Sequence, residues 1–502
     1  MSSASAEILI GMALFMTYWF LVLIFKDRLK KRNITSLTPE YLPPILMIRT
    51  KRGLKFLDRI SRYRRFWELI SNIGIPAVFF GMAYMFFLII LMDYILFTTP
   101  LKPSLITSPR SAFLIPGLNP YIPLIWGLIG LIVTLIVHEF SHAILCRAEG
   151  ARVKSLGILF ALVPIGGFAE LDEKDLMSEK IKRIQRIRIF SAGVISNFMV
   201  AFISFLIFFN LLNCLTPHIV ILNSDVVEKG SVLLKINDID VFNQKDVENI
   251  VKSSKNLVLE IRDKNGNIKR ISVNKITGVY VSDVLRDYPA AKAGIKGKTV
   301  IVEVNGSEVL NIKRFIEIMK KTRPGDIISV KTYDGKSFKS FSVKLVKSPN
   351  GDYGFMGVII GGDYLSGMIL GYSDQILWTI KQIPRDPKGL LYLTAMPFYF
   401  SGFSDEMFNY FSPSGFWKNT GYTIYYLLNL FYWIGWINFY VGLFNCLPAI
   451  PLDGGRVLNE TLLTFLRSKR GEKISFFIVR SLALFIFLSI ILSLIIPNLL
   501  IK

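Results

Sequence analysis

The sequence has little cysteine and little histidine. It contains 3 of each in 502 residues. Cys146, Cys214 and Cys446 form no Cys-x-x-Cys pair, so we expect neither a disulfide framework nor a thiolate zinc site. Acidic residues are also scarce, at 37 against 59 lysines and arginines, which leaves a net charge of +22. The basic residues cluster beside apolar stretches and accompany no recognisable nucleic-acid-binding motif, so we expect no nucleic-acid partner.

Apolar residues, in contrast, make up 52% of the chain, and the mean hydropathy is +0.45. The chain is too apolar for an ordinary soluble enzyme, yet its 19% of charged residues is too many for a protein that lies wholly in a membrane. Apolar stretches of bilayer length predict six crossings. They lie at residues 8–25, 75–97, 121–146, 190–212, 421–446 and 476–496. A shorter stretch at 390–403 is interrupted by Pro397 and Gly402, so we expect it to be interfacial or re-entrant.

The basic residues predict the orientation of these spans. Lysines and arginines concentrate at residues 26–65, which the positive-inside rule places in the cytoplasm. The N-terminus is then outside, and no small-residue cleavage site follows the first span, so we expect it to be a retained anchor. Counting crossings places the basic segments 180–188 and 467–473 inside and residues 216–420 outside. We therefore expect a multi-pass integral membrane protein, in the cell membrane if the organism is prokaryotic.

The long external segment is expected to be aqueous, folded and repetitive. Apolar and polar residues alternate along it, with turn signals such as Asn265-Gly266 and Asp334-Gly335. The stretch that begins at Lys229-Gly230 aligns with the one that begins at Lys296-Gly297, and each continues through a helix to a hairpin. These features predict two tandem copies of one small α/β fold.

The third apolar stretch contains the sequence His-Glu-Phe-Ser-His at residues 138–142. Helix positions four apart share a face, so His138 and His142 can bind one metal ion, and Glu139 lies within reach of a metal-bound water. Ionisable groups at membrane depth are costly unless they are paired or bind a ligand. The motif therefore predicts a metal site, and the alternative is a pair of core histidines in a helix that merely carries a glutamate. Cys146, one turn further on, is expected to pack in the apolar helix, and the alternative is that it is a fourth metal ligand.

A third metal ligand is expected where the fifth apolar stretch ends. Pro448 and Pro451 prevent a regular helix there, and the glycines that follow allow a tight turn. Irregular backbone in a membrane must be buried in protein or line a wet cavity. The predicted topology brings Asp453 to the depth of the two histidines. Two histidines and one carboxylate leave a fourth position for water, the pattern of catalytic zinc sites, whereas the alternative is a surface turn with a solvated aspartate.

These motifs resemble those of the site-2 proteases, a family of intramembrane zinc metalloproteases. His-Glu-x-x-His and Asn-x-x-Pro-x-x-x-Leu-Asp-Gly are both complete, at 138–142 and 445–454. Residues 163–171 resemble the family's short membrane-associated β segment, which is thought to guide substrate in extended form. Residues 193–197 resemble its Gly-Pro-x-x-Asn motif, with Val194 in place of the proline. The first two spans are additions to the minimal core of the family.

The resemblance implies a role for four charged or metal-binding side chains. His138, His142 and Asp453 would bind one Zn²⁺ per chain. Glu139 would act as general base and then as general acid. The ligand types alone also suit other divalent ions.

The resemblance also implies substrate contacts for four smaller or neutral residues. Asn445 and Asn197 would hold the substrate backbone or the developing oxyanion, and the alternative is that they only join helices by hydrogen bonds. Gly166 and Gly167 would allow close approach of a substrate strand, or would simply form a turn.

The second copy of the repeat resembles PDZ domains of bacterial and archaeal proteases, through the segment that begins at Tyr288-Pro-Ala-Ala-Lys-Ala-Gly. Such domains bind peptides, often at a C-terminus, by adding a strand to a sheet edge. The resemblance places that groove along Gly278, Val279, Tyr280 and Val281. The first copy lacks the Pro-Ala-x-x-Ala-Gly segment, and a packing role without a ligand is the alternative for it.

We therefore expect a polytopic α-helical membrane protein of about six transmembrane helices, with a tandem pair of α/β PDZ-like domains inserted between spans four and five. The expected domains are an N-terminal two-span region, the first half of a protease core, a degenerate PDZ-like domain, a PDZ domain, an interfacial connection and the second half of the core. Their ranges are 1–120, 121–215, 216–275, 276–362, 363–420 and 421–502.

The expected function is hydrolysis of peptide bonds within or next to transmembrane segments of membrane proteins, at an active site near the cytoplasmic side. The partners would be those substrates, the lipid bilayer and a C-terminal peptide at the PDZ-like domains. One alternative is a non-catalytic metal-binding membrane scaffold with PDZ modules. A transporter with a metal site at the bilayer midplane is another, but the spans lack the inverted repeats that would favour it.

Overall fold

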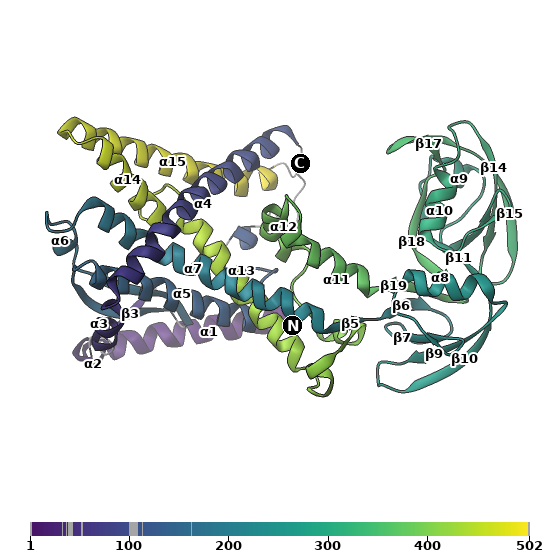
Figure 1. The fold of residues 1–502 in the computed structure, drawn as a ribbon, viewed down its shortest axis with the longest axis horizontal. Coiled ribbons are helices and arrows are strands. Elements are labelled where there is room, and N and C mark those ends of the chain that lie inside the picture. Colours follow the sequence, from purple (N-terminus) through teal and green to yellow (C-terminus); the bar gives the residue numbers. More distant parts are fainter. Residues whose placement is uncertain are drawn as a thin grey trace. The chain divides into compact units, whose positions relative to one another are not determined.

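The computed structural model describes residues 3–32, 34–36, 38, 44–51, 54–99, 109–112, 114–161 and 163–499. The chain divides into two compact units. The first comprises residues 1–208, 394–402 and 429–502, and the second comprises residues 209–393 and 403–428. Figure 1 shows their helices and strands.

Within the described residues, five helices are long and apolar enough to cross a membrane. They are α4 (Arg64–Thr98), α5 (Leu124–Ala148), α7 (Arg183–Leu211), α13 (Thr423–Asn445) and α15 (Lys469–Leu499). They coincide with five of the six predicted spans. The first predicted span falls on α1 (Ser3–Ile24), whose described apolar part is Phe15–Ile24, so a sixth crossing stays a prediction. The stretch at 390–403 overlaps the short helix α12 (Gly389–Ala395).

Small residues allow the long helices of the first unit to approach one another closely. A Cβ atom added at Gly130 of α5 would lie 2.9 Å from the Trp433 carbonyl oxygen of α13. A Cβ atom added at Gly74 of α4 would lie 2.6 Å from Ile195 of α7. Apolar side chains drive little association inside a bilayer, so close backbone packing at such positions contributes much of the helix contact there.

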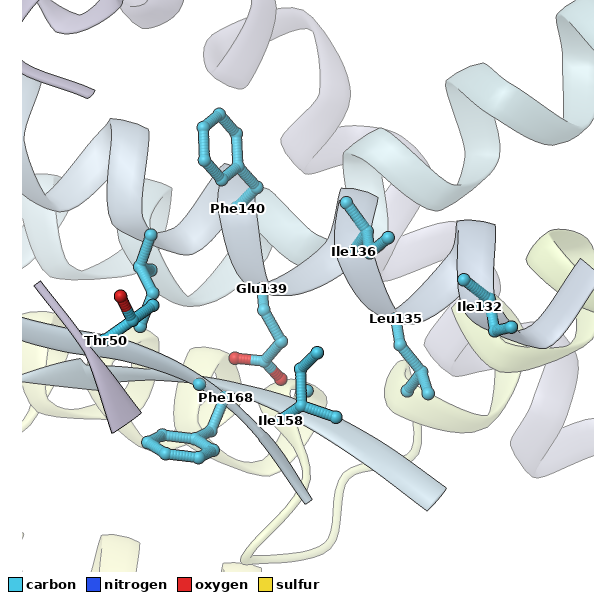
Figure 2. A pocket seen from close by; sticks show the side chains of 11 residues that line it. Thr50, Ile132, Leu135, Ile136, Glu139, Phe140, Ile158 and Phe168 are labelled. Atoms are coloured by element: carbon cyan, nitrogen blue, oxygen red, sulfur yellow. The ribbon is translucent and has the colours of Figure 1, made fainter. Parts of the chain in front are cut away.

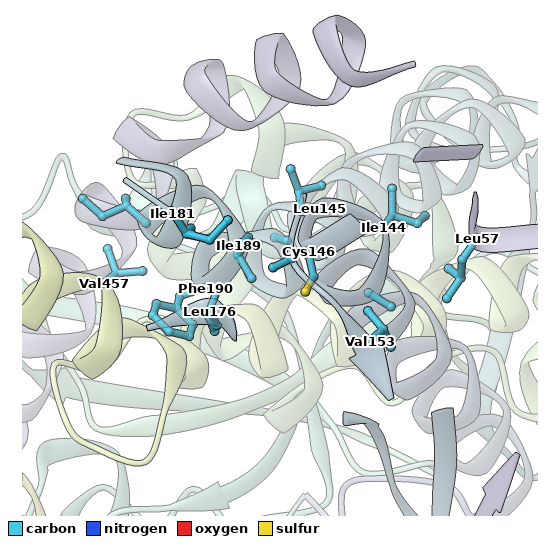
Figure 3. Close-up of a cluster of buried hydrophobic side chains, with 14 residues drawn as sticks. Leu57, Ile144, Leu145, Cys146, Val153, Leu176, Ile181, Ile189, Phe190 and Val457 are labelled. Atoms are coloured by element: carbon cyan, nitrogen blue, oxygen red, sulfur yellow. The ribbon is translucent and has the colours of Figure 1, made fainter. Parts of the chain in front are cut away.

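A buried apolar cluster surrounds the end of α5 that follows the His-Glu-x-x-His sequence (Figure 3). It joins α5 to α7, to α3 (Leu54–Ser61) and to α14 (Asp453–Phe465). Leu57, Cys146, Ile189 and Val457 are fully buried within it. Cys146 therefore packs in the core, as expected. The cluster fixes α14 relative to α5 and thereby positions Asp453 near the histidines.

The first unit also contains a four-stranded antiparallel sheet, in the order β1-β2-β3-β4. Its strands are β1 (Ile34–Ser36), β2 (Leu46–Thr50), β3 (Val153–Ala161) and β4 (Val163–Leu171). Strand β4 coincides with the β segment at 163–171 that was expected from the family resemblance, whereas β3 was not predicted. The first two come from the N-terminal region, and β2 pairs with β3 from Leu46 opposite Phe160 to Thr50 opposite Leu156. The sheet therefore ends at β4, which packs against α5.

The second unit contains two similar α/β halves, in agreement with the predicted repeat. The first half is β6 (Ile219–Ser224), β7 (Val232–Ile236), β8 (Ile239–Asp240), α8 (Gln244–Ser253), β9 (Asn256–Arg262) and β10 (Ile268–Asn274). The second is β11 (Thr277–Val284), α9 (Pro289–Lys292), β12 (Thr299–Val304), β13 (Ser307–Glu308), α10 (Ile312–Met319), β14 (Ile327–Tyr333) and β15 (Phe338–Lys344). Asn243 and Asn311 cap α8 and α10 in the same way, because each side chain accepts a hydrogen bond from the backbone three residues later.

A further hairpin joins the two halves into one continuous sheet. Its strands are β18 (Val358–Leu365) and β19 (Met368–Tyr372). The sheet runs β10-β9-β7-β6-β19-β18-β11-β12-β14-β15. Strand β18 crosses the predicted domain boundary at residue 362, because the hairpin completes both halves and does not belong to a separate connection.

Candidate active site

His138, His142 and Asp453 converge on one point. Helix α5 carries the two histidines one turn apart, and Asp453 is the first residue of α14. The Nε2 atoms of the histidines are 3.3 Å apart, and the Asp453 Oδ2 atom lies 3.2 Å from His138 Nε2 and 3.1 Å from His142 Nε2. Two imidazole nitrogens and a carboxylate oxygen in this arrangement fit a tetrahedral zinc ion with one open position. It is the one such group of three or more potential ligands found in the described part of the chain.

The backbone of α7 orients the ring of His142. Its Nδ1 atom lies 2.7 Å from the carbonyl oxygen of Ile189. An Nδ1–H group that donates to this oxygen leaves the Nε2 lone pair free to face Asp453 and a metal.

A side chain of α7 orients the ring of His138. The amide group of Asn197 lies 3.1 Å from His138 Nδ1, and Asn197 is fully buried. Metal binding through Nε2 requires a proton on Nδ1, so the amide oxygen must then face the ring, an orientation that a half-turn of the amide provides. Asn197 therefore lies behind His138, outside the cavity that the metal group faces.

Glycine at position 193 makes room for both rings. A Cβ atom added there would lie 2.5 Å from His138 Cε1 and 2.5 Å from His142 Nε2, much closer than ordinary van der Waals contact. Gly193 is the first residue of the predicted Gly-x-x-x-Asn motif, but no role was predicted for it. The signal was present as the first position of Gly-x-x-x-Asn, but the role depends on where α7 crosses α5.

Glu139 lies beside the metal group and against the sheet. One carboxylate oxygen, Oε2, accepts a hydrogen bond of 2.8 Å from the Ala169 backbone N–H of β4. A Cβ atom added at Gly167 would lie 3.1 Å from Glu139 Cγ, so this glycine allows β4 to approach α5. Gly166 pairs with Leu159 in the ladder between β3 and β4.

A cavity of about 880 Å³ opens at these residues. Its lining includes the three potential ligands, Glu139 and Asn445. Asn445 is the last residue of α13, is half-buried and donates to the Val441 carbonyl of its own helix. The cavity also contains Arg456, whose guanidinium lies 5.5 Å from the centre of the Phe190 ring. No function was predicted for this arginine from the sequence.

The residues predicted to form the peptide groove lie on β11. This strand is paired on both sides, because Val279 is opposite Ile301 of β12 and also opposite Asp363 of β18. Strand addition needs a free edge. A peptide could therefore add along Gly278, Val279, Tyr280 and Val281 only after β18 had left.

One known protein resembles this chain over most of its length, and solved PDZ domains resemble a small part of it. An uncharacterized protein of Methanocaldococcus jannaschii is 24% identical over 415 residues, which cover 82% of this chain and 76% of that protein. The PDZ domain of an SdrC-like protein from Listeria innocua is 28% identical over 17% of this chain and 97% of that domain, with a TM-score of 0.16. The PDZ domain of an SdrC-like protein from Listeria monocytogenes is 26% identical over 16% of this chain and 86% of that domain, with a TM-score of 0.15.

The family is established by a match over most of the chain. Residues 126–489 match the model of peptidase family M50. The matched region contains both halves of the candidate site, and the resemblance to site-2 proteases is confirmed. The chain belongs to peptidase family M50, whose members are membrane-embedded zinc metalloproteases.

Proposed function

We propose that this protein is an intramembrane zinc protease that hydrolyses peptide bonds within or beside transmembrane segments of other membrane proteins. Glu139 lies beside a converging group formed by His138, His142 and Asp453, and this observation carries the proposal. Glu139 and both histidines lie on α5, a helix of membrane-spanning length and composition, and Asp453 begins α14. A non-catalytic scaffold would need neither the three ligands nor Glu139. His138, His142 and Asp453 are the proposed zinc ligands.

Bound zinc would lower the pKa of a water molecule at the open position and polarise the scissile carbonyl group. Glu139 would act as the general base that takes a proton from the attacking water, and then as the general acid that delivers it to the leaving nitrogen. Its Oε2 atom is held by the Ala169 N–H group, so Oε1 is the oxygen left to carry the proton. Asn445, in the same cavity, donates to the substrate backbone or the developing oxyanion.

The substrate segment must be extended when it is cut, because a helical peptide bond is hydrogen-bonded and surrounded by its own side chains. Strand β4 ends its sheet, and the Ala169 N–H group on its outer side already reaches Glu139. A substrate segment that lies along this edge brings its backbone to the general base. We therefore expect residues that destabilise a helix to favour cleavage.

The proposed topology keeps the N-terminus and the PDZ-like repeat outside the cytoplasm, with the active site near the cytoplasmic side. It rests on the basic segments at 26–65, 180–188 and 467–473. The proposed domain ranges are those of the sequence analysis, with the PDZ-like pair extended through β19.

The test is cleavage of a model single-span substrate by the purified protein in detergent, read by mass spectrometry of the products. Wild type should cut within or next to the apolar span. Glu139→Gln should keep one zinc per chain and lose at least about a hundredfold in rate, because general acid–base catalysis contributes that much or more. Asp453→Asn should lose both its activity and its zinc. Cleavage by Glu139→Gln at the wild-type rate would refute the assigned role, whatever the zinc content.

A further inference from the structure

A second cavity, of about 240 Å³, lies next to Glu139 (Figure 2). Its walls come from α5, β3, β4 and the end of β2. Among the lining residues that the structure describes, Glu139 is the one with an ionisable side chain, and it also lines the larger cavity of the metal group. The two cavities therefore meet at the proposed general base.

The mouth of this cavity is apolar and accessible. Ile136 of α5 and Ile158 of β3 line it with 58% and 46% of their surface exposed. A segment that arrives from the hydrocarbon layer meets these side chains before it meets Glu139. Ligand pockets usually begin at about 300 Å³, so a cavity of about 240 Å³ fits one large side chain better than a whole ligand.

The N-terminal region forms one wall. Thr50, the last residue of β2, lines the cavity. The neighbouring Arg49 forms an ion pair of 3.4 Å with Glu170 of β4, and its guanidinium lies 6.0 Å from the centre of the Phe168 ring. Phe168 also lines the cavity. This wall lies outside residues 126–489, the part of the chain that matches the family.

We propose that this cavity is a specificity pocket that takes a large apolar side chain of the substrate, from a residue next to the scissile bond, and that β2 closes it. The inference rests on the proposed protease function. An extended substrate segment that presents its backbone to Glu139 also has a neighbouring side chain that needs a binding site. If the cavity is that site, the N-terminal region takes part in substrate selection through β2.

The experiment compares substrates that carry leucine or alanine at each position flanking the cut. Wild type should prefer leucine at one of these positions by about tenfold or more, the usual range for apolar pockets. Leu135→Trp fills the pocket from α5, and Thr50→Trp fills it from β2. Each should abolish the preference while alanine substrates are still cut. Ile125→Trp is the matched control, because Ile125 lies on the same helix, is 69% exposed and does not line the cavity.

An unchanged leucine preference in both filled variants would overturn the inference. The inference would also be overturned if the filled variants kept the leucine preference but their cleavage rate depended differently on lipid chain length. That result would identify the cavity as a lipid-binding site. Failure of wild type to cut any substrate would count against the proposed function itself. If Leu135→Trp loses zinc or fails to fold, Thr50→Trp decides.

The hairpin β18–β19 of the second unit pairs with the first strand of each half. Strand β18 pairs with β11, the first strand of the second half, from Thr277 opposite Leu365 to Val284 opposite Val358. Strand β19 pairs with β6, the first strand of the first half. One hairpin thus covers the corresponding edge in both halves.

The buried carboxylate of Asp363 ties this hairpin to both helices. It accepts hydrogen bonds from the Ile312 N–H at the start of α10, at 2.7 Å, and from Gln244 at the start of α8, at 2.7 Å. The Tyr372 hydroxyl of β19 donates a third, at 3.0 Å. Leu365 is buried in the core of the first half.

The geometry points to an internal ligand: the hairpin occupies the strand-addition edges of both PDZ-like halves and keeps them closed to external peptides. The probe is a labelled synthetic peptide with the sequence of residues 358–365 and a free C-terminus, added to the full-length protein. Wild type should bind the peptide at least about tenfold more weakly than Asp363→Ala or Leu365→Ala does. Each of these variants removes contacts that hold the hairpin against the two halves. Asp352→Ala, at an exposed carboxylate outside the hairpin, is the control.

Hydrogen exchange of the β18 amides is measured in the same samples. Faster exchange together with tighter binding in the two variants supports the inference. The inference would be overturned if wild type bound the peptide as tightly as the two variants do while its β18 amides stayed protected from exchange. It would also be overturned if the variants exchanged faster but bound the peptide no more tightly than wild type. If neither variant exchanges faster, the hairpin is a permanent part of the fold and the inference also fails.

Discussion

Different groups orient the two histidines of the proposed zinc site. Zinc affinity should therefore depend on the residue that orients His138 but not on the side chain of the residue that orients His142. Asn197 contacts His138 through its side chain, whereas His142 contacts a backbone carbonyl that no substitution of Ile189 removes. Loss of such an orienting partner typically lowers metal affinity by about 10 to 100-fold.

We therefore expect Asn197→Ala to weaken zinc binding by about 10 to 100-fold, measured by competition with a chelator. Asn197→Asp keeps an acceptor for the Nδ1–H group and should retain more of the affinity than the alanine variant. Asn438→Ala, at another fully buried asparagine in the first unit, is the control. Wild-type affinity in Asn197→Ala would show that the contact with His138 has no orienting role.

The third histidine, His218, predicts a pH dependence of the second unit. Burial, and then the charge of Arg262, lower the pKa of His218 to about 4. An unfolded histidine has a pKa of about 6.5, so the folded state favours the neutral ring. The stability gained is fully present above the unfolded pKa and is lost as the pH falls from about 6.5 toward 4, by about 3 kcal/mol in total.

Hydrogen exchange of β6 and β7 between pH 7 and pH 4 checks this expectation, after correction for the intrinsic pH dependence of exchange. His218→Gln should flatten the corrected profile. A variant that loses stability with acid as steeply as wild type would assign the effect to other groups.

The convergence of the three proposed ligands could be predicted from the sequence because the rules involved are local or chemical. A spacing of four places His138 and His142 on one helix face, and a lone carboxylate in a broken segment at membrane depth has few other uses. The roles of Gly193 and Asn197 could not be predicted, because they depend on where one helix crosses another.

At the scale of elements, the crossing of α7 over α5 determines whether the metal group can form. Gly193→Ala adds a methyl group 2.5 Å from both rings. We expect this variant to lose most of its bound zinc while it stays folded, measured as zinc per chain alongside circular dichroism. Met199→Ala, at an exposed position of the same helix, should keep its zinc. Full zinc occupancy in Gly193→Ala would mean that the helices separate at little cost.

The long helices were also predictable, because each is an uninterrupted apolar stretch. Of the four-stranded sheet, only β4 was predicted, at residues 163–171. Strand β2 pairs with a strand more than a hundred residues later, and nothing in the local sequence of residues 46–50 specifies that partner. The hairpin β18–β19 escaped prediction for the same reason, since each strand pairs with a different half of the repeat.

At the scale of the whole molecule, zinc would join parts of the first unit that are distant in sequence, so its removal should have a local effect. A ligand present at 100 times its dissociation constant stabilises the fold by about 2.7 kcal/mol. We expect a chelator to speed hydrogen exchange in α5 and α14 and to leave β9 and β14 of the second unit unchanged. Faster exchange throughout both units would contradict the expectation that zinc stabilises only the part of the first unit around its proposed ligands.

The distance along the chain between the proposed ligands has a consequence for biosynthesis. His142 and Asp453 are 311 residues apart. A ribosome that adds about 5 to 20 residues per second makes the aspartate roughly 15 to 60 s after the histidine. Until the aspartate has been made, the proposed zinc site has only two of its three ligands. We therefore expect the nascent chain to be unable to cleave other membrane proteins during that time.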